Sequence, residues 1–600
     1  MPFGAEARDD GVTRFRLWAP GARSVALWLE DRGRALPMPR DAEGWAELAA
    51  REAPPGTRYR FQIDGELLVP DPASRFQPDD VHGPSEVVDP LAYTWSDANW
   101  AGLPIERLVF YELHVGTFTR AGTFSAAAER LDHLAALGVT AVELMPVSDF
   151  PGRRGWGYDG VLPFAPEARY GRPEDLKALV DAAHARGLAV FLDVVYNHFG
   201  PEGNYLHRYA PAFFDPRHQT PWGAAINFDG PGSEIVRAFV VHNALYWLEE
   251  FHMDGLRLDA VHAIRDDSRS RVLVELARVV AAGPGSERPV HLVLENDANE
   301  ARYLARDGAP LYRAQWNDDL HHALHVLLTG ERSGYYADYQ PAAPALGRAL
   351  AEGFVYQGEH SRYRDRPRGE PIADLPPTAF VGFLQNHDQV GNRAFGERIT
   401  ALAPPEAVRA ATSVLCLAPS LPLLFMGQEW AAAEPFLFFS DLGPDIGPAV
   451  AEGRRREFAR FPEFADAKAR ERIPDPQAPA TWERSTLDWS AVERPPHRDW
   501  LDFHRALLRI RHAEIVPLLS GEIAPRTSWT RLGETAIEVE WTFPVWRVLR
   551  LVANLGPAAI PHGGPGSEWG RQLYSLGLGR SAWAELPPWS VGWYLAEAER

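Results

Sequence analysis

The chain has 600 residues, of which 46% are apolar and 24% charged, and its formal net charge is −20. This length predicts one large domain with smaller domains attached. The acidic charge argues against the basic stripe of a nucleic-acid-binding protein. No run of 18 apolar residues occurs, residues 1–12 lack the basic and apolar segments of a signal peptide, and Cys416 is the only cysteine. We therefore expect a cytoplasmic protein without internal disulfides that does not enter a membrane.

Residues 1–93 predict a small β-sandwich. Apolar and polar residues alternate over 15–17 and over 25–29, which is the pattern of strands with one buried face. Asp64-Gly65 is a typical hairpin turn. We therefore expect an immunoglobulin-like β-sandwich at this end of the chain.

Residues 94–500 predict a catalytic (β/α)8 TIM barrel. Short apolar runs that end in polar residues, typical of buried parallel strands, alternate here with helical patterns. The eight runs lie at 108–116, 141–147, 188–198, 255–262, 291–297, 314–319, 379–388 and 421–430. Two intervening helices are clear, at 173–186 and 235–252. This alternation favours a barrel. A doubly wound open sheet is the alternative, but no G-x-G-x-x-G follows any of the runs.

The last hundred residues return to β character. Strand-like apolar runs lie at 536–543, 546–555 and 591–595. We therefore expect a C-terminal β-sandwich domain over 501–600, so that a sandwich flanks the α/β barrel on each side.

The ends of the predicted barrel strands are unusually polar. Catalytic residues of such barrels cluster where the strands end. The polar residues at these ends are Asp193, Asn197, His198, Arg257, Asp259, Glu295, His387 and Asp388. Any one of them alone could have a structural role, but carboxylates, histidines and an arginine meeting at one rim indicate an active site.

Asp259 and Glu295 have the surroundings that a pair of catalytic carboxyl groups needs. Arg257 and Asp259 are two residues apart on a strand, so both side chains point to one face, and the guanidinium favours the ionised carboxylate of a nucleophile. Glu295 follows an apolar run, so burial should raise its pKa and suit it to general acid work. Glycoside hydrolysis requires two carboxyl groups, one ionised and the other protonated. The Asp388 side chain could bind sugar hydroxyls.

Four of these segments resemble the signature regions of the α-amylase superfamily. They are DVVYNH (193–198), GLRLDAVH (255–262), LVLEND (292–297) and QNHDQVG (385–391), in the expected order and on the expected strands. The resemblance implies a retaining enzyme with Asp259 as nucleophile, Glu295 as acid/base and Asp388 as stabiliser of the transition state. It further implies that His198, Arg257 and His387 hold the sugar and that Tyr158, in GWGYDG, stacks beneath it. The alternative for Tyr158 is a loop aromatic packed on the core.

Within that superfamily the chain most resembles the maltooligosyltrehalose trehalohydrolases, over 70–90, 156–206, 220–237 and 315–339. This resemblance implies cleavage of the α-1,4 bond next to the terminal trehalose of maltooligosyltrehalose. It also implies that a maltooligosyltrehalose synthase supplies the substrate. A branching enzyme with the same catalytic trio is the alternative, and a catalytically inactive glucan-binding protein is a third. Asn296 departs from the family pattern, in which a serine follows the acid.

Further substrate-binding residues are expected around the site, some of them on the leaving-group side. Polar groups placed there for the bend of a 1,1-linked disaccharide would penalise other sugars, because a buried unpaired group is costly. The candidates on that side are Asp318, Asp319, His322, Trp222 and the loop from Asp388 through Gln389, Val390 and Gly391 to Asn392. Other candidates for contact with the substrate are Leu258, Ala260, Val261, His262, Leu320 and His321. Alternatively, residues 315–322 merely start a barrel helix with an aspartate cap. No cofactor and no metal site are expected, since the adjacent pair His321 and His322 should point apart.

Overall fold

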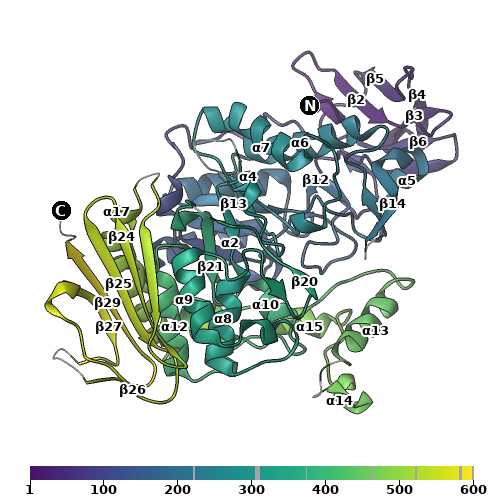
Figure 1. Ribbon diagram of the computed structural model, residues 1–600. Coiled ribbons are helices and arrows are strands. Elements are labelled where there is room, and N and C mark those ends of the chain that lie inside the picture. The colour runs from purple at the N-terminus through teal and green to yellow at the C-terminus, as the bar shows by residue number, and fades with distance from the viewer. Residues whose placement is uncertain are drawn as a thin grey trace.

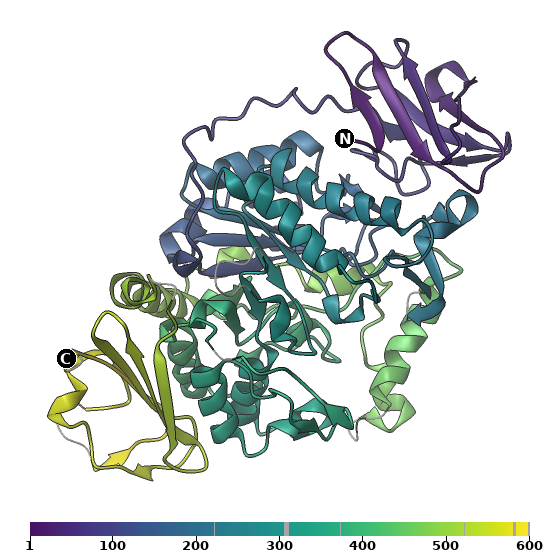
Figure 2. The ribbon, with the colours of Figure 1, turned by 45° about the horizontal axis from the view of Figure 1, so that its top comes forward.

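The computed structural model describes residues 1–220, 223–304, 311–372, 374–459, 461, 464–520, 523–579 and 584–597. It has three parts, with the N-terminal strands and the C-terminal sheet at opposite ends of a central α/β barrel (Figures 1 and 2). No helix in these ranges is both long enough and apolar enough to cross a membrane.

The N-terminal part consists of two antiparallel sheets, as the alternating pattern predicted. One sheet contains β1 (Gly4–Ala7), β2 (Thr13–Trp18) and β5 (Trp45–Ala50). The other contains β3 (Val25–Leu29), β4 (Arg34–Pro37), β6 (Arg58–Ile63), β7 (Leu67–Val69) and β8 (Ser85–Glu86). Phe15, Leu27 and Phe61, from three of these strands, are fully buried in its core. Asp64 and Gly65 both have positive φ in the turn between β6 and β7, which explains why a residue that tolerates this conformation stands at each position.

Eight parallel strands close into the central barrel, which confirms the predicted fold class. They are β9 (Phe110–Leu113), β10 (Ala141–Leu144), β13 (Ala189–Val194), β16 (Gly255–Leu258), β17 (His291–Leu294), β18 (Ala314–Trp316), β21 (Phe380–Phe383) and β22 (Leu421–Phe425). Each strand lies inside one of the eight predicted runs, and all its residues are buried. The polar residues that end the runs therefore meet at one rim of the barrel.

Helices cover the outside of the barrel. Helix α4 (Pro173–His184) starts with proline and turns Leu176, Leu179 and Val180 inward, and α6 (Ser233–Glu249) is the second predicted helix. The other helices in the described ranges are α1 (Val115–Phe118), α2 (Phe124–Ala128), α3 (Leu131–Leu137), α5 (Leu206–Tyr209), α7 (Val272–Ala282), α8 (Asp318–Thr329), α9 (Ala342–Glu352), α10 (His387–Gly391), α11 (Ile399–Leu402), α12 (Pro405–Leu417), α13 (Gly447–Phe458), α14 (Ala467–Glu471), α15 (Pro479–Arg484), α16 (His497–Ile510) and α17 (Val516–Leu519).

Three short hairpins lie in the loops that follow barrel strands. They are β11 (Ser148–Asp149) with β12 (Leu162–Pro166), β14 (Phe214–Thr220) with β15 (Gly223–Ile226), and β19 (His360–Ser361) with β20 (Arg366–Pro367). The first carries the loop of Tyr158, and the third follows α9. The loops of the first and third hairpins contribute residues to the wall above the strand ends.

The C-terminal part is a five-stranded antiparallel sheet with a two-stranded sheet beside it. The larger sheet contains β23 (Arg526–Arg531), β24 (Ala536–Phe543), β25 (Arg547–Asn554), β27 (Arg571–Leu576) and β29 (Ser590–Glu597), and the smaller one β26 (Ile560–Pro561) and β28 (Glu585–Leu586). Helix α16 crosses the expected boundary at 500/501 and packs against α3 and α12 of the barrel. We therefore propose that the boundary lies after α17, near residue 520.

Candidate active site

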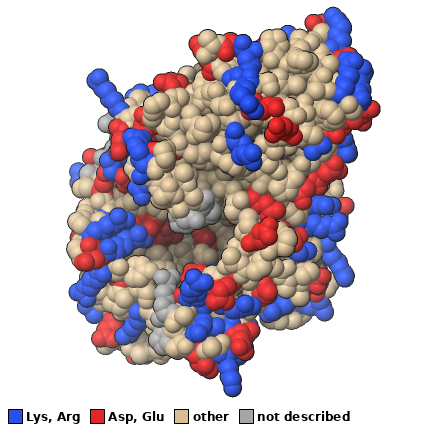
Figure 3. Space-filling model, turned by 90° about the vertical axis from the view of Figure 1, so that its right-hand side faces the viewer, with Lys and Arg blue, Asp and Glu red and all other residues tan. Residues whose placement is uncertain are grey.

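A cavity of about 500 Å³ opens where the barrel strands end. Figure 3 shows a hollow near the middle of one face of the molecule, with acidic side chains visible inside it. The sequence-predicted residues that line this cavity are Tyr158, His198, Asp259, Ala260, His262, Glu295, Asp318, His322, His387, Asp388, Gln389 and Asn392. The three predicted catalytic carboxyl groups thus face one cavity from three different strands.

Arg257, on β16, joins the carboxyl groups at the floor of the cavity. Its guanidinium has no exposed surface and contacts Asp193 at 2.6 Å, Asp259 at 2.9 Å and Glu295 at 2.9 Å. It also lies 4.1 Å from the ring centroid of Trp316. Because a planar guanidinium binds carboxylates from fixed directions, this one residue orients Asp259 and Glu295 toward the same space.

Asp259 accepts hydrogen bonds that stabilise its negative charge. Beyond the Arg257 contact, Asn197 Nδ2 donates to Oδ2 of Asp259 at 2.8 Å. The next residue, Ala260, has φ of 39°, a left-handed conformation that is uncommon for a residue with a side chain. This turn directs the Ala260 N–H toward Glu295 Oε2 at 2.8 Å. Strained backbone of this kind is often found at functional sites.

Glu295 lies in surroundings that favour its protonated form. Burial raises the pKa of its carboxyl group, and the Asp259 charge adds to this, while Arg257 and the Ala260 N–H oppose it. The net direction is upward. A carboxyl group that keeps its proton near neutral pH can serve as a general acid.

Asp388 is the most exposed of the three predicted catalytic carboxyl groups, with 35% of its side chain accessible. Asn392 Nδ2 donates to its Oδ1 at 3.1 Å, and His387 Nε2 lies 3.5 Å from the same oxygen. Burial by itself would lower the pKa of His387, but the charges of Asp388 and Glu112 outweigh it and raise the pKa to about 9. A charged His387 and a carboxylate at Asp388 therefore stand side by side at the cavity.

Tyr158 faces the cavity from the loop between β11 and β12. Its hydroxyl donates to Asp193 at 2.6 Å, and its ring stacks on His387 with centroids 5.0 Å apart and an angle of 24°. His198 Nε2 lies 2.9 Å from the Tyr158 carbonyl oxygen. These contacts hold the Tyr158 ring against the floor of the cavity, in a place where a sugar face could stack on it.

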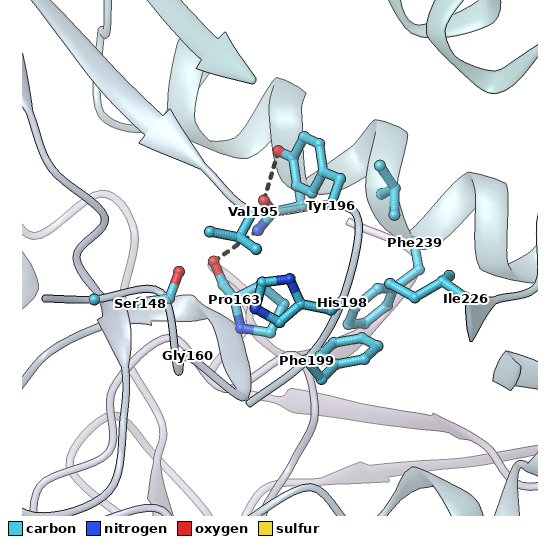
Figure 4. A pocket seen from close by; sticks show the side chains of 12 residues that line it. Ser148, Gly160, Pro163, Val195, Tyr196, His198, Phe199, Ile226 and Phe239 are labelled. Atoms are coloured by element: carbon cyan, nitrogen blue, oxygen red, sulfur yellow. Dashed lines mark hydrogen bonds between the residues drawn. The ribbon is translucent and has the colours of Figure 1, made fainter. Parts of the chain in front are cut away.

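A second, much smaller cavity lies behind His198. It has a volume of about 20 Å³ and is lined mostly by apolar groups, with His198 and Phe199 on one side and Pro163 and Phe239 nearby (Figure 4). This volume is close to that of a single water molecule, so the cavity is too small for a sugar. His198 therefore forms part of the wall between the two cavities.

Helix α8 places some of the predicted leaving-group residues at the cavity and turns others away. Asp318 and His322, four residues apart and so on one helix face, both line the cavity. Asp319 has no exposed surface and binds Arg368 Nη1 at 2.8 Å and the Tyr339 hydroxyl at 2.5 Å. Asp319 therefore supports residues of the wall and does not reach the cavity itself.

Several other predicted residues lie in the core next to the site. Asn317 caps α8 by accepting from the Leu320 N–H, so the cap is an asparagine and not an aspartate. The predicted residues that are buried and do not line the cavity are Arg257, Leu258, Val261, Leu320, His321, Val390 and Gly391. Arg257 therefore orients the carboxyl groups from beneath the cavity and has no surface with which to hold the sugar itself. Trp222 lies outside the described residues.

The cavity also has lining residues that sequence reasoning missed. They are Trp156, Asp297, Tyr335, Asp338, Tyr339, Tyr363, Arg364 and Arg368. Arg364 and Arg368 both contact the Asp297 carboxylate, two residues after the acid. The density of tyrosines in 335–339 and of arginines in 362–368 was the available signal. Among the residues described, no group of three or more His, Cys, Asp or Glu side chains is arranged to hold a metal ion.

Two protein families match parts of the chain. Residues 92–217 match the catalytic domain of alpha amylase. Residues 2–90 match carbohydrate-binding module 48, the isoamylase N-terminal domain. The two matches fall on the barrel and on the N-terminal sheets.

A branching enzyme is similar over a smaller part of the chain. The 1,4-alpha-glucan branching enzyme of Vibrio parahaemolyticus is 38% identical over 43% of this chain and 37% of its own length. This similarity does not extend over the whole protein, so it supports a shared catalytic barrel and not a shared activity.

Much longer similarities connect the chain with another group. The malto-oligosyltrehalose trehalohydrolase of Deinococcus radiodurans is 46% identical over 86% of this chain and 83% of its own. That of Saccharolobus solfataricus is 42% identical over 85% and 87%. A crystal structure from Salmonella typhimurium, described as an alpha amylase, has 44% identity and a TM-score of 0.94 over 99% of both chains. The chain belongs to the malto-oligosyltrehalose trehalohydrolase family of alpha-amylase-type glycosidases.

Proposed function

We propose that this protein hydrolyses the α-1,4 bond next to the terminal trehalose of maltooligosyltrehalose, with retention at the anomeric carbon. The observation that carries the chemistry is the single guanidinium of Arg257, which holds Asp259 and Glu295 at 2.9 Å each on the floor of one cavity. The identity of the substrate is inferred from membership of the family. The retaining mechanism needs two carboxyl groups close together, one ionised and one protonated.

In the first step Asp259 attacks the anomeric carbon of the glucose whose bond breaks. Glu295 donates its proton to the glycosidic oxygen, so trehalose leaves with a free hydroxyl and the sugar stays bound to Asp259 as an ester. In the second step Glu295 takes a proton from water, whose oxygen displaces the Asp259 carboxylate. Asp388 and the charged His387 would bind the hydroxyls of the distorted sugar and stabilise its developing charge.

On the leaving-group side, His322 and Asp318 are our candidates for contacts with trehalose. Burial lowers the pKa of His322 well below its usual range, so the imidazole is neutral. The ring lines the cavity, while its Nδ1 is itself buried and has no hydrogen-bond partner within the part of the chain that the structure describes. A neutral ring edge at the cavity can bind a sugar hydroxyl placed for it, and it penalises a substrate that offers none. Tyr335 lies beside it, with ring centroids 4.8 Å apart.

Chromatography of the products tests this proposal. The protein is incubated with maltooligosyltrehalose and, separately, with amylose. We expect trehalose from the first substrate, and proton NMR of the fresh products should show the new reducing end as the α-anomer. Formation of α-1,6 branches on amylose without any trehalose would instead establish a branching enzyme. A new reducing end in the β form would exclude the retaining mechanism.

We also propose that the protein works in the cytoplasm, downstream of an enzyme that makes its substrate. Cys416, the only cysteine, is buried and free, which suits a reducing compartment. The 1,1-linked end of maltooligosyltrehalose must be installed on a glucan by another enzyme, such as a maltooligosyltrehalose synthase. Deletion of the gene should make cells accumulate the 1,1-capped glucan in the cytoplasmic fraction, and an unchanged glucan pool would contradict this role.

A further inference from the structure

Glu112 is a buried carboxylate that binds His387 from barrel strand β9, two strands away from β21, which His387 follows. Only 1% of either side chain is exposed. One carboxylate oxygen accepts the backbone N–H of His387 at 3.0 Å, and the other lies at the ring Nδ1 of the same residue. This two-point contact fixes the histidine ring with its other nitrogen, Nε2, toward Asp388 at 3.5 Å.

We infer that Glu112 is a positioning residue of the proposed glycosidase, which keeps both nitrogens of His387 protonated and aims the Nε2–H at the sugar beside Asp388. The inference rests on the proposed function for its sugar, but the Glu112–His387 contact does not depend on it. Glu112 touches no substrate, since it is absent from the residues that line the cavity. It acts only through the charge and the orientation of the histidine.

The balance of charges around His387 explains why this carboxylate matters. The charged or titratable groups that face the histidine are Glu112 on β9, His114 after β9, Glu143 on β10, Asp193 on β13, Arg257 on β16, Tyr158 above it and Asp388 beside it. Burial and Arg257 both disfavour a second positive charge, whereas Asp388 and Glu112 together raise the pKa of His387 to about 9. Asp388 is 35% exposed and lies 3.5 Å from the ring, whereas Glu112 is buried and contacts the histidine at two points. Glu112 is therefore the fixed part of the support.

Loss of the Glu112 charge would change which hydrogen bonds His387 can form. A neutral imidazole that donates from Nδ1 has a lone pair at Nε2. It would then accept a hydrogen bond from the sugar and could no longer donate one to it. Glutamine at position 112 keeps the size of glutamate but has no charge and only one oxygen, so with that oxygen on Nδ1 it gives up the hydrogen bond from the His387 backbone N–H. Glu112→Gln therefore tests the charge with little change in packing.

Glu143 offers a matched control on the adjacent strand. It pairs with Glu112 in register across β10 and β9 and is equally buried. Neither of its carboxyl oxygens has a hydrogen-bond partner among the described residues. Burial raises the pKa of Glu143 well above its usual range, which favours its neutral form. The same substitution there, Glu143→Gln, changes an equally buried carboxyl group without removing a hydrogen bond to His387.

The test follows the His387 ring by NMR in protein labelled with 13C-histidine, with the signal assigned from its loss in His387→Gln. In wild type the ring should stay an imidazolium beyond pH 8. In Glu112→Gln its titration should move down by about one pH unit or more, because a nearby opposite charge is lost. Glu143→Gln should leave the titration unchanged.

The activity at pH 8 should fall about tenfold or more in Glu112→Gln, a loss typical of one catalytic hydrogen bond to a charged group, and less than about twofold in Glu143→Gln.

An unchanged His387 titration in Glu112→Gln, or an equal shift in Glu143→Gln, would overturn the inference. Circular dichroism and the melting temperature show whether each variant is folded. If Glu112→Gln does not fold, Glu112→Asp decides, because it keeps the charge and should keep the high titration while losing some activity through orientation. The NMR experiment needs no substrate. A wild-type protein that releases no trehalose would therefore count against the proposed function and leave the Glu112–His387 result to be judged separately.

Discussion

At the scale of single residues, the site depends on two carboxyl groups. Both contact Arg257, but they differ in the hydrogen-bond donors and charges around them. Glu295 combines burial with one backbone hydrogen bond and a raised pKa. Asp259 binds Arg257 and the Asn197 amide at the same time. This difference supports our proposal that Glu295 carries the proton and Asp259 the nucleophilic oxygen, and the choice of leaving group tests it.

Glu295→Gln should slow the release of trehalose by about 10²–10⁴-fold, because a sugar oxygen needs a proton in order to leave. The loss should be much smaller for an α-maltosyl fluoride, since fluoride leaves without protonation. Steady-state kcat on both substrates measures the difference. Asp259→Asn is the comparison, because it removes the nucleophile and should abolish activity on both. Equal losses for the two leaving groups in Glu295→Gln would show that Glu295 is not the acid.

The sequence predicted the residues at the strand ends better than those in the loops. Asp259 and Glu295 follow buried apolar strands, so their common rim follows from the barrel alone. Asp318 and Asp319 are neighbours in sequence, but successive helix residues differ by about 100° in direction, and only the first faces the cavity. Tyr335 and Arg364 come from segments without a regular pattern, which tertiary packing brings to the wall.

At the scale of elements, the loop of Tyr158 depends on tight backbone turns. Gly157 has φ of 100°, and a Cβ atom there would lie 2.0 Å from the Pro146 carbonyl oxygen. Gly187 also has positive φ, of 74°, but a Cβ atom there would meet nothing within 4 Å. An alanine at either position would have an unfavourable positive φ. Only at Gly157 would its Cβ atom also overlap a neighbouring atom.

Gly157→Ala should therefore reduce kcat/KM by about 10–100-fold, because the loop must shift and displacement of a substrate-positioning ring by about 1 Å has effects of this size. Gly187→Ala should cost about 1–2 kcal/mol of stability from its left-handed backbone and leave kcat/KM unchanged. Kinetics and thermal melting of both variants separate the two effects. Similar kinetics for both variants would mean that the loop tolerates the overlap and does not depend on this turn.

The hairpin of β11 and β12 holds two buried acids near the same loop. Burial raises the pKa of Asp149 well above its usual range and that of Glu167 to about 7. The charge of Glu167 also raises the pKa of Asp149, and the charge of Asp80 raises both. The pKa values of both acids are higher in the folded state than in the unfolded state. Protonation of these acids therefore stabilises the folded protein, and this contribution is fully present at acidic pH. It is lost as the pH rises through about 7, where Glu167 ionises in the folded state.

Asp149→Asn should accordingly reduce the alkaline loss of stability, since a neutral amide does not repel the ionised Glu167. We expect the melting temperature of wild type to fall between pH 6 and pH 9 and that of the variant to fall less. The difference at pH 9 should correspond to about 1 kcal/mol, as for one pKa unit. Differential scanning calorimetry over this pH range measures it. Parallel curves for the two proteins would show that the pair does not control the pH dependence.

All eight barrel strands could be predicted, but the hairpins between them could not. Buried parallel strands leave a continuous apolar run, as in 189–194, whereas β19 (His360–Ser361) and β20 (Arg366–Pro367) are two residues long and mostly polar. Such short pairs are fixed by the neighbours that they contact. The wall of the candidate site was therefore less predictable than its floor.

At the scale of the whole molecule, the N-terminal sheets are fastened to the barrel at α6. Phe3 packs edge-on against Phe239 of this helix, with ring centroids 5.2 Å apart. At the C-terminal end of the same helix, Arg75 donates three hydrogen bonds to Glu250, at 3.0–3.2 Å. The two side chains are only 6% and 17% exposed. The family match of 2–90 ends before the barrel begins, so sequence alone could delimit this module but could not show how it docks.

The Arg75–Glu250 pair should matter mainly when one partner is missing. Glu250→Ala would leave the Arg75 guanidinium buried without its carboxylate and should destabilise the protein by about 3 kcal/mol, at the lower end for buried pairs because Glu250 is partly exposed. Replacing both residues by methionine should cost less, since the Arg75 guanidinium is then gone and only Lys177, whose Nζ lies 3.8 Å from Glu250, loses its carboxylate. Glu52→Ala provides the surface control, because its ion pair with Arg34 is 51% and 32% exposed and should contribute less than about 1 kcal/mol. Urea unfolding measures all three variants. If Glu250→Ala and the double methionine variant were equally destabilised, the loss would come from packing at α6, and the pair would not be what fastens the module to the barrel.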